Sequence, residues 1–295
     1  MLTDPPDHIT VIIPTFNRAH TLERALNSVF SQTRIPDQVI VVDDGSTDHS
    51  GDLIRERFPR VDYIRQPNRG VSVARNTGIR QASNQQDDAW IALLDSDDEW
   101  LPEKLEKQLA AWQQQRQYRL IHSDEIWIRR GQRVNAMKKH RKRGGYIFQY
   151  CLPRCVISPS AVLLKRGLLR QTGLFEESLP VCEDYDLWLR ICHREAVLMV
   201  DEPLIIKYGG HHDQLSRKLR AMDRFRVQAL QRCLQLGTLS DADRRACIDM
   251  LLHKLDILIQ GAAKRGRHTD IIHYQQIRQR YSAIDADIDT AGLAQ

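Results

Sequence analysis

The chain has no apolar run long enough to cross a membrane as a helix, which needs about 20 such residues. Its best apolar segments, WIALL (residues 90–94) and AVLMV (residues 196–200), have the length of strands. The first residues, MLTDPPDHITVIIP, lack the basic region and long apolar core of a secretion signal. These absences predict a cytoplasmic protein without an integral membrane segment.

Paired cysteine motifs are also missing. The six cysteines form no CxxC pair and no repeated spacing; they are Cys151, Cys155, Cys182, Cys192, Cys233 and Cys247. In a chain without an export signal, this pattern favours reduced thiols over disulfides or a zinc site.

Acidic residues are absent from one long stretch. Residues 126–175 contain no Asp or Glu but twelve Lys or Arg, eight of them in residues 129–143. The formal net charge of the whole chain is only +5, so the basicity is concentrated in this region. Such a region attracts anions, although a solvated basic loop is the simpler alternative.

What the sequence does contain is an alternation of short apolar strands and amphipathic helices. Strands are predicted at HITVIIP (8–14), QVIVVDD (38–44), VDYIRQ (61–66) and WIALL (90–94), with a helical pattern after each. This order predicts an α/β fold with a mostly parallel sheet flanked by helices. After about residue 216 the periodicity is helical throughout, so we expect a helical C-terminal appendage over residues 216–295.

Unusual residues fall where the predicted strands end. Pro14 and Phe16 lie at the end of the first strand, Asp44 closes the second, and Asp95 and Asp97 follow the fourth. Parallel sheets place ligand sites outside the carboxyl ends of their strands. We therefore expect these side chains to line one site.

The segment LLDSDDEW (residues 93–100) concentrates carboxylates that repel one another. On an extended backbone, Asp95 and Asp97 would point to the same side and Asp98 away from them. The cluster could be a solvated loop, an acid/base pair, or a site for a divalent cation such as Mg²⁺ or Mn²⁺. Two carboxylates are too few to enclose an ion, which favours a metal completed by a diphosphate.

Five segments together carry a resemblance to a known family. In chain order they are VIIPTFNR, VIVVDDGSTD, NRGVSVARNTGI, LLDSDD and CEDYDLWLR. Their succession closely resembles family 2 glycosyltransferases of the GT-A fold, over about residues 8–216. The resemblance implies inverting, metal-dependent transfer of a sugar from a nucleotide-diphospho-sugar, here taken as a UDP-sugar, to an acceptor hydroxyl. It also implies a GT-A domain at residues 1–215, with a nucleotide-sugar half at about 1–117 and an acceptor half at 118–215.

The resemblance assigns roles to the strand-end residues. Pro14 and Phe16 would line the nucleobase pocket, with Asp44 bonded to the base and Asp95 near the ribose. Asp97 would bind the Mn²⁺ or Mg²⁺ that bridges the two phosphates, and Arg75 would help to hold the donor. For Phe16, ordinary core packing is the alternative.

The resemblance also assigns the catalytic base, because the Asp of a Glu-Asp pair before an LW-containing helix has this role in the family. Here it is Asp184, with Glu183 and Asp186 as competing choices and a helix N-cap as the alternative role. His212 would contact the metal or close over the donor, with His211 nearly equivalent and a surface histidine as the alternative.

The absence of membrane spans and of a QxxRW motif separates this chain from processive members of the family. We expect it to add one or a few sugars. The basic region favours an anionic acceptor, such as a cell-envelope glycan or glycolipid, and peripheral contact with the anionic inner face of the cytoplasmic membrane. A catalytically inactive sugar-nucleotide binder and, with less support, a nucleic-acid binder remain as alternatives.

Overall fold

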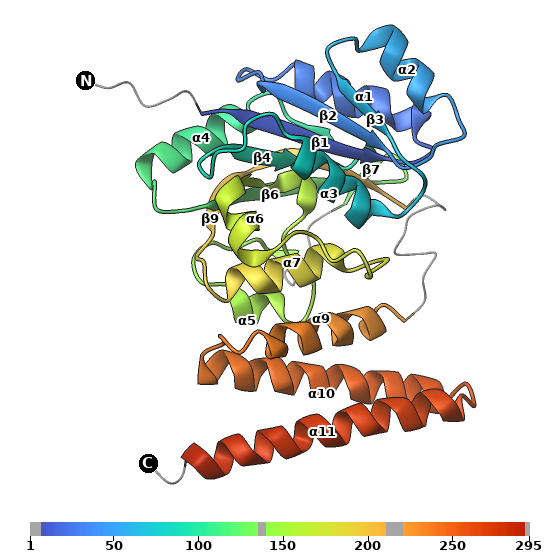
Figure 1. Cartoon of the computed structure of the whole chain (residues 1–295), viewed down its shortest axis with the longest axis vertical. Helices are drawn as coiled ribbons and strands as arrows, with labels where there is room; N and C mark the ends of the chain where they lie inside the picture. Colours follow the sequence, from blue (N-terminus) through green and yellow to red (C-terminus); the bar gives the residue numbers. More distant parts are fainter. Residues whose placement is uncertain (1–6, 135–139, 211–220, 293–295) are drawn as a thin grey trace.

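The computed structural model of the chain describes residues 7–134, 140–210 and 221–292, and its side chains as far as residue 284. In these ranges the polypeptide builds one nine-stranded sheet with helices packed on it, followed by a stack of C-terminal helices (Figure 1). This architecture confirms the predicted α/β class and the helical C-terminal region.

The first half of the sheet is parallel. Its strands are β1 (Ile9–Thr15), β2 (Gln38–Asp43), β3 (Asp62–Arg65) and β4 (Trp90–Leu93), in the spatial order β3-β2-β1-β4. Ile12 of β1 belongs to one hydrophobic core, whereas Val11 and Ile13 belong to the core on the opposite face. Strands that are buried on both faces consist of continuous apolar runs. For this reason the sequence predicted β1, β2 and β4.

Helices cover both faces of this half. They are α1 (Ala19–Phe30), α2 (Ser50–Arg57), α3 (Val71–Gln81) and α4 (Lys104–Gln114). Residues of α1, α2 and α4 join the core of Val11, while α3 packs on the other face against Ile12. A Cβ atom at Gly78 of α3 would lie 2.5 Å from Cγ2 of Ile12, so glycine is required for this close approach. The approach fixes the position of α3, which carries Arg75.

The second half of the sheet is mixed. Its strands are β5 (Glu99–Trp100), β6 (Leu120–Arg129), β7 (Gln132–Val134), β8 (Leu163–Lys165) and β9 (Leu198–Gly209). β8 lies antiparallel between β4 and β6, β9 pairs parallel with β6, and β5 ends the order β3-β2-β1-β4-β8-β6-β9-β5. The predicted parallel arrangement therefore applies to the first four strands. Beyond them, the antiparallel pairing of β5 with β9 brings β9 beside the loop that follows β4.

The remaining helices form a layer below the sheet in Figure 1. They are α5 (Phe148–Cys151), α6 (Arg166–Thr172), α7 (Glu183–Cys192), α9 (Asp223–Gln235), α10 (Asp241–Ala263) and α11 (His268–Gly292). Leu230 of α9 and Leu251 of α10 are buried in the same hydrophobic core as Leu189 of α7. The C-terminal helices thus share a core with the helix that carries the predicted base.

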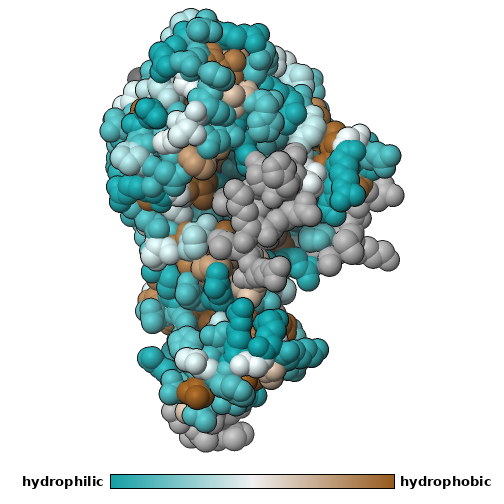
Figure 2. Space-filling view, turned by 90° about the vertical axis from the view of Figure 1, so that its right-hand side faces the viewer, coloured by the Kyte–Doolittle hydropathy of each residue, from teal (hydrophilic) through white to brown (hydrophobic). Residues whose placement is uncertain are grey.

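The surface shown in Figure 2 is dominated by hydrophilic residues, with hydrophobic residues in small separate patches. Within the described ranges, no helix is both long enough and apolar enough to span a bilayer.

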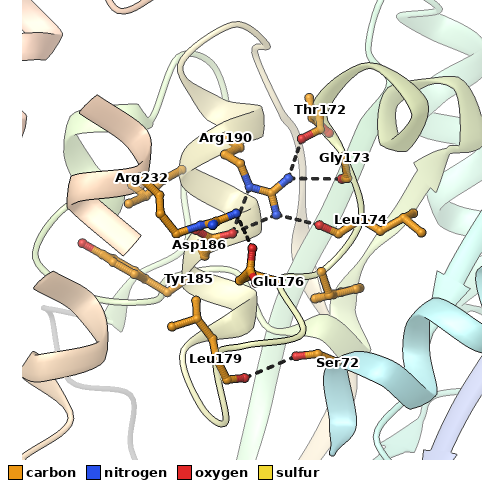
Figure 3. A network of polar contacts seen from close by, with 12 residues as sticks. Ser72, Thr172, Gly173, Leu174, Glu176, Leu179, Tyr185, Asp186, Arg190 and Arg232 are labelled. Atoms are coloured by element: carbon orange, nitrogen blue, oxygen red, sulfur yellow. Dashed lines mark hydrogen bonds and ion pairs between the residues drawn. The ribbon is translucent and has the colours of Figure 1, made fainter. Parts of the chain in front are cut away.

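A buried ionic network ties α7 to its neighbours (Figure 3). Asp186, which is 1% exposed, accepts hydrogen bonds from Nε of Arg190 (2.9 Å) and from Nε of Arg232 (3.1 Å) on α9. Arg190 also donates to the carbonyl oxygen of Leu174 (2.7 Å), and Arg232 pairs with Glu176. The network therefore fastens α7 both to the loop that precedes it and to α9.

Substitution of Asp186 tests the importance of this network. Asp186→Ala leaves the buried guanidinium of Arg190 without its carboxylate, and we expect a loss of about 3–5 kcal/mol in the free energy of unfolding. The matched control is Asp256→Ala, which removes the exposed Arg278–Asp256 pair (2.8 Å) and should cost at most about 1 kcal/mol. Urea denaturation measures both, and equal losses would contradict the structural role of Asp186.

Candidate active site

The loop after β1 presents an aromatic ring at the edge of the sheet. Pro14 is buried at the end of β1, whereas Phe16 is 42% exposed, which rules out the core-packing alternative for this ring. The next residue, Asn17, has φ = 52° and accepts a hydrogen bond from the backbone N–H of Thr47 (2.8 Å) through Oδ1. Asn17 joins the loops after β1 and β2 and thereby fixes Phe16 near Asp44. Sequence reasoning missed this role, although Asn is a residue that tolerates positive φ.

Asp44 is buried and organises the entry to α3. Its Oδ1 accepts hydrogen bonds from Nε2 of Gln66 (2.7 Å) and the backbone N–H of Arg69 (2.9 Å). Its Oδ2 accepts one from the backbone N–H of Gly70 (2.7 Å), the N-cap of α3. An ionised carboxylate offers about four acceptor positions, so capacity remains for a base.

The acidic loop after β4 is a turn, and the expected extended backbone is wrong. The N–H of Asp98 donates to the carbonyl oxygen of Asp95 (3.0 Å), which closes a turn over Ser96 and Asp97. Asp98 does not point away into solvent: it is 2% exposed. It accepts a hydrogen bond from Oγ of Ser160 (2.6 Å) and pairs with Nζ of Lys207 (3.2 Å).

Charges in this loop shift the acidity of its carboxyl groups. Burial raises the pKa of Asp98 to about 7, against the favourable charge of Lys207. Burial and the charge of Asp95 also raise the pKa of Asp97. For Asp95, burial is outweighed by the positive charges of Arg75 and Lys207, which lower its pKa. A further cation near Asp97 would therefore stabilise the loop.

Arg75 links the acidic loop to α7. It is 3% exposed, and its Nη2 pairs with Oδ1 of Asp95 (2.7 Å) while its Nη1 pairs with Oε1 of Glu183 (2.6 Å). The ring of Phe175 lies 5.1 Å from the guanidinium carbon. Both ends of the guanidinium are thus engaged by carboxylates, which gives Arg75 a positioning role that the sequence did not suggest.

The predicted base lies in the first turn of α7. Cys182, with φ = 63°, is the N-cap, so the N-cap alternative for Asp184 is wrong. Asp184 is half-buried, and its Oδ2 lies 3.2 Å from the thiol of Cys155. Burial and the Asp184 charge raise the pKa of Glu183 to about 7, although Arg75 opposes this shift. Asp186 is enclosed by arginines and unsuited to be the base.

The basic region divides into buried and exposed parts. Nζ of Lys142 pairs with Oε1 of Glu125 (2.9 Å) and donates to the carbonyl oxygen of Val156 (2.7 Å), with its side chain 5% exposed. Its predicted place in an acceptor-binding patch is therefore wrong. Arg141 and Arg143 are exposed. Two further lysines of the basic region and both candidate histidines lie outside the described residues; these are Lys138, Lys139, His211 and His212.

Two site residues had no recognisable sequence signal. Ser160 donates to Asp98 and also accepts a hydrogen bond from the N–H of Asp95 (3.1 Å). Lys207 reaches the loop from β9, and the carboxylates of Asp98 and Asp95 raise its pKa against the effect of burial. Lys207 belongs to β9 and Ser160 to the short 3-10 helix before β8, and both are brought to the acidic loop only by the tertiary fold.

Comparisons with known proteins agree with this geometry. Residues 10–172, more than half of the chain, match the family model Glycosyl transferase family 2. An uncharacterized glycosyltransferase of Rickettsia felis is 30% identical over 204 residues, which cover 66% of this chain and 32% of that protein. The chain thus spans less than two thirds of the length of such relatives.

Two solved structures share the fold. S. aureus TarS 1–349 in complex with UDP-GlcNAc superposes with a TM-score of 0.66 at 17% identity, covering 94% of this chain and 92% of that one. The mannosyltransferase PcManGT from Pyrobaculum calidifontis, in complex with GDP-Man and Mn²⁺, gives 0.60 at 16% identity, with 97% and 86% covered. The fold is therefore of the GT-A type expected from the resemblance, and the chain belongs to glycosyl transferase family 2.

Proposed function

We propose that the chain is an inverting, metal-dependent, non-processive glycosyltransferase that moves one sugar from a UDP-sugar to an acceptor hydroxyl. The observation that carries this proposal is the Arg75 bridge, which brings Asp95 at the end of β4 beside the Glu183–Asp184 pair at the start of α7. A donor-binding loop and a carboxylate able to accept a proton then belong to one site.

The donor half of this site comprises the loops after β1, β2 and β4. Phe16, exposed above buried Pro14, stacks on the nucleobase, Asp44 accepts a hydrogen bond from the base, and Asp95 lies near the ribose. TarS has been solved with UDP-GlcNAc and with UDP, which supports a uridine nucleotide as donor. Arg75 acts on the donor through Asp95.

The residues around Asp97 fit a divalent cation. Its carboxylate is half-exposed, and its pKa is raised by burial and by Asp95, so a hard cation would be favoured there. No group of three metal-binding side chains occurs within the described ranges, as expected if a diphosphate completes the ligand set. His212 is the proposed additional ligand. When bound, Mn²⁺ or Mg²⁺ stabilises the negative charge that develops on the departing diphosphate. PcManGT, solved with Mn²⁺, supports this choice.

Asp184 performs the proton transfer. As the acceptor oxygen forms its bond to the anomeric carbon and the bond to the diphosphate breaks, Asp184 takes the hydroxyl proton on the face opposite the leaving group. Glu183 is less suitable, because its Oε1 is paired with Arg75 and its side chain is 9% exposed. Glu183 instead holds the start of α7 against α3.

The acceptor is proposed to be anionic, such as a cell-envelope glycan or glycolipid at the inner face of the cytoplasmic membrane. Arg141 and Arg143 are exposed cations in the acid-free region, and the guanidinium of Arg143 lies 4.4 Å from the ring of Tyr150. An exposed cation beside an aromatic face suits a negatively charged saccharide.

Asp97→Asn tests donor and metal binding. With UDP and Mn²⁺ at a hundredfold excess over Kd, the wild type should gain about 5 °C in Tm, and EDTA should abolish the gain. Asp97→Asn should lose most of this shift because a neutral amide is a poor ligand for Mn²⁺. The exposed Asp249→Asn on α10 is the control. A metal-dependent shift that persists in Asp97→Asn would contradict the assignment.

Asp184→Asn tests the proposed base and separates an active enzyme from an inactive binder. We expect kcat to fall by about 10²–10⁴-fold, because the amide cannot accept the proton, with the UDP-induced Tm shift unchanged. The assay follows UDP release from a panel of UDP-sugars. Release by the wild type that Asp184→Asn retains in full would refute the base, and no release from any donor would favour an inactive binder.

The double variant Arg141→Gln/Arg143→Gln tests the acceptor surface. It should raise the KM for an anionic acceptor, leave donor hydrolysis unchanged, and weaken the salt dependence of KM. The control is Lys264→Gln/Arg265→Gln, which neutralises two exposed cations at the turn after α10. Lys142→Gln should instead lower Tm, since it leaves Glu125 buried without its partner. An unchanged acceptor KM in the first variant would exclude this surface.

A further inference from the structure

The two carboxylate oxygens of Asp184 have different hydrogen-bond donors. Oδ1 accepts from the backbone N–H of Tyr185 (2.7 Å), the next residue of α7. Oδ2 lies 3.2 Å from Sγ of Cys155, which comes from a segment 29 residues earlier in the chain, and the same Sγ lies 3.2 Å from the carbonyl oxygen of Ile157. A neutral thiol therefore holds the outer edge of the proposed base.

The segment that carries Cys155 is itself fixed at several points. Nζ of Lys142 donates to the carbonyl oxygen of Val156 (2.7 Å), and Lys142 is anchored by Glu125. The hydroxyl of Tyr185 donates to the carbonyl oxygen of Leu152 (2.6 Å). The thiol is thus held on a braced loop between α5 and the short helix η2 (Pro159–Ala161), and its position relative to Asp184 is set by the fold.

The thiol keeps its proton at working pH. Burial and the nearby Asp184 carboxylate raise the pKa of Cys155 well above its ordinary value. The single proton of the thiol is shared between Oδ2 and the carbonyl oxygen of Ile157, so toward Asp184 the thiol acts only as a weak donor. A weak neutral donor orients a carboxylate with little loss of basicity, whereas a cation at the same place would lower the carboxyl pKa strongly.

The neighbouring Glu183 shows the contrasting arrangement. It is held by the guanidinium of Arg75, and both of these side chains are almost fully buried. Asp184 is half-buried and is held by a thiol. The two adjacent carboxylates thus have different partners: a cation holds the one that fixes α7, and a neutral donor holds the one that must accept a proton.

We propose that Cys155 is a positioning residue for Asp184, whose Sγ–H holds Oδ2 so that the carboxylate is oriented for proton transfer. This inference rests on the proposed role of Asp184 as the base. It adds a residue that lies outside the five recognised sequence segments.

Other charged or titratable groups surround this pair and remain unchanged in the test. They lie on α7 and its N-cap, on α3, on α5, in the basic region, on β6 and on α9, and they are Glu183, Cys182, Arg75, Cys151, Lys142, Glu125, Arg226 and Asp223. A change produced by substituting Cys155 alone can therefore be assigned to the thiol.

The first arm measures the carboxyl group directly in the full-length protein without ligand. The ¹³C spectrum of protein labelled at the aspartate carboxyl carbons is recorded at one pH, and the resonance missing in Asp184→Asn identifies Asp184. Cys155→Ala removes the donor, so the surroundings of the Asp184 carboxylate change and its resonance should move. Cys155→Ser restores a donor and should return most of this shift. The control is Cys192→Ala, which changes a buried cysteine at the C-terminal end of α7.

The second arm measures the reaction. UDP release is followed at the same pH with Mn²⁺ and the UDP-sugar that the wild type hydrolyses fastest. Because a poorly oriented carboxylate takes the proton less efficiently, Cys155→Ala should lower kcat by about two- to tenfold with little change in donor KM. Cys155→Ser and Cys192→Ala should stay near the wild type.

The outcomes separate this inference from the proposed function. An Asp184 resonance that stays unchanged in Cys155→Ala overturns the inference, even if Asp184→Asn is inactive and the base assignment stands. A moved resonance with an unchanged kcat also overturns it, since the thiol would then act on a carboxylate that the reaction does not use. Full activity of Asp184→Asn removes the base, and the inference with it.

Discussion

One buried guanidinium determines how the two halves of this protein meet. Arg75 pairs with Asp95 at the end of β4 and with Glu183 at the start of α7. Glu183 lies 108 residues after Arg75 in the chain. Two carboxylates this close to each other would repel without the cation between them, and a planar guanidinium can serve both at once. The tight packing of Gly78 on Ile12 fixes the helix that supplies Arg75. The site therefore depends on the packing of α3 on β1.

The parts of this arrangement that follow from local sequence were predictable. β1, β2 and β4 are buried on both faces, so their apolar runs mark them, and the residues after each run lie at the same edge of a parallel sheet. This placed Phe16, Asp44 and Asp97 correctly at strand ends. The acidic first turn of α7 was also predictable, because carboxylates are stabilised at the positive end of a helix dipole.

The parts that depend on the second half of the sheet were not predictable. Lys207 and Ser160 reach the acidic loop from β9 and from the segment before β8, and neither strand is adjacent to β4 in sequence. The acidic loop forms a turn at Asp97 instead of the expected extended backbone for a related reason. The Ser160 hydroxyl accepts a hydrogen bond from the N–H of Asp95 before the turn and donates one to Asp98 after it. Within the basic region, the tertiary positions of Glu125 and of the Val156 carbonyl oxygen distinguish buried Lys142 from exposed Arg141 and Arg143.

The helix that carries Asp184 is enclosed by structure on several sides. α9 covers one side through Arg232, and the loop before α7 is fastened through Arg190 (Figure 3). On the proposed role of Asp184 as the base, its position is fixed by these neighbours, and the acceptor hydroxyl has to approach it. Substitutions at exposed positions around the site should then leave the proton-accepting group in place.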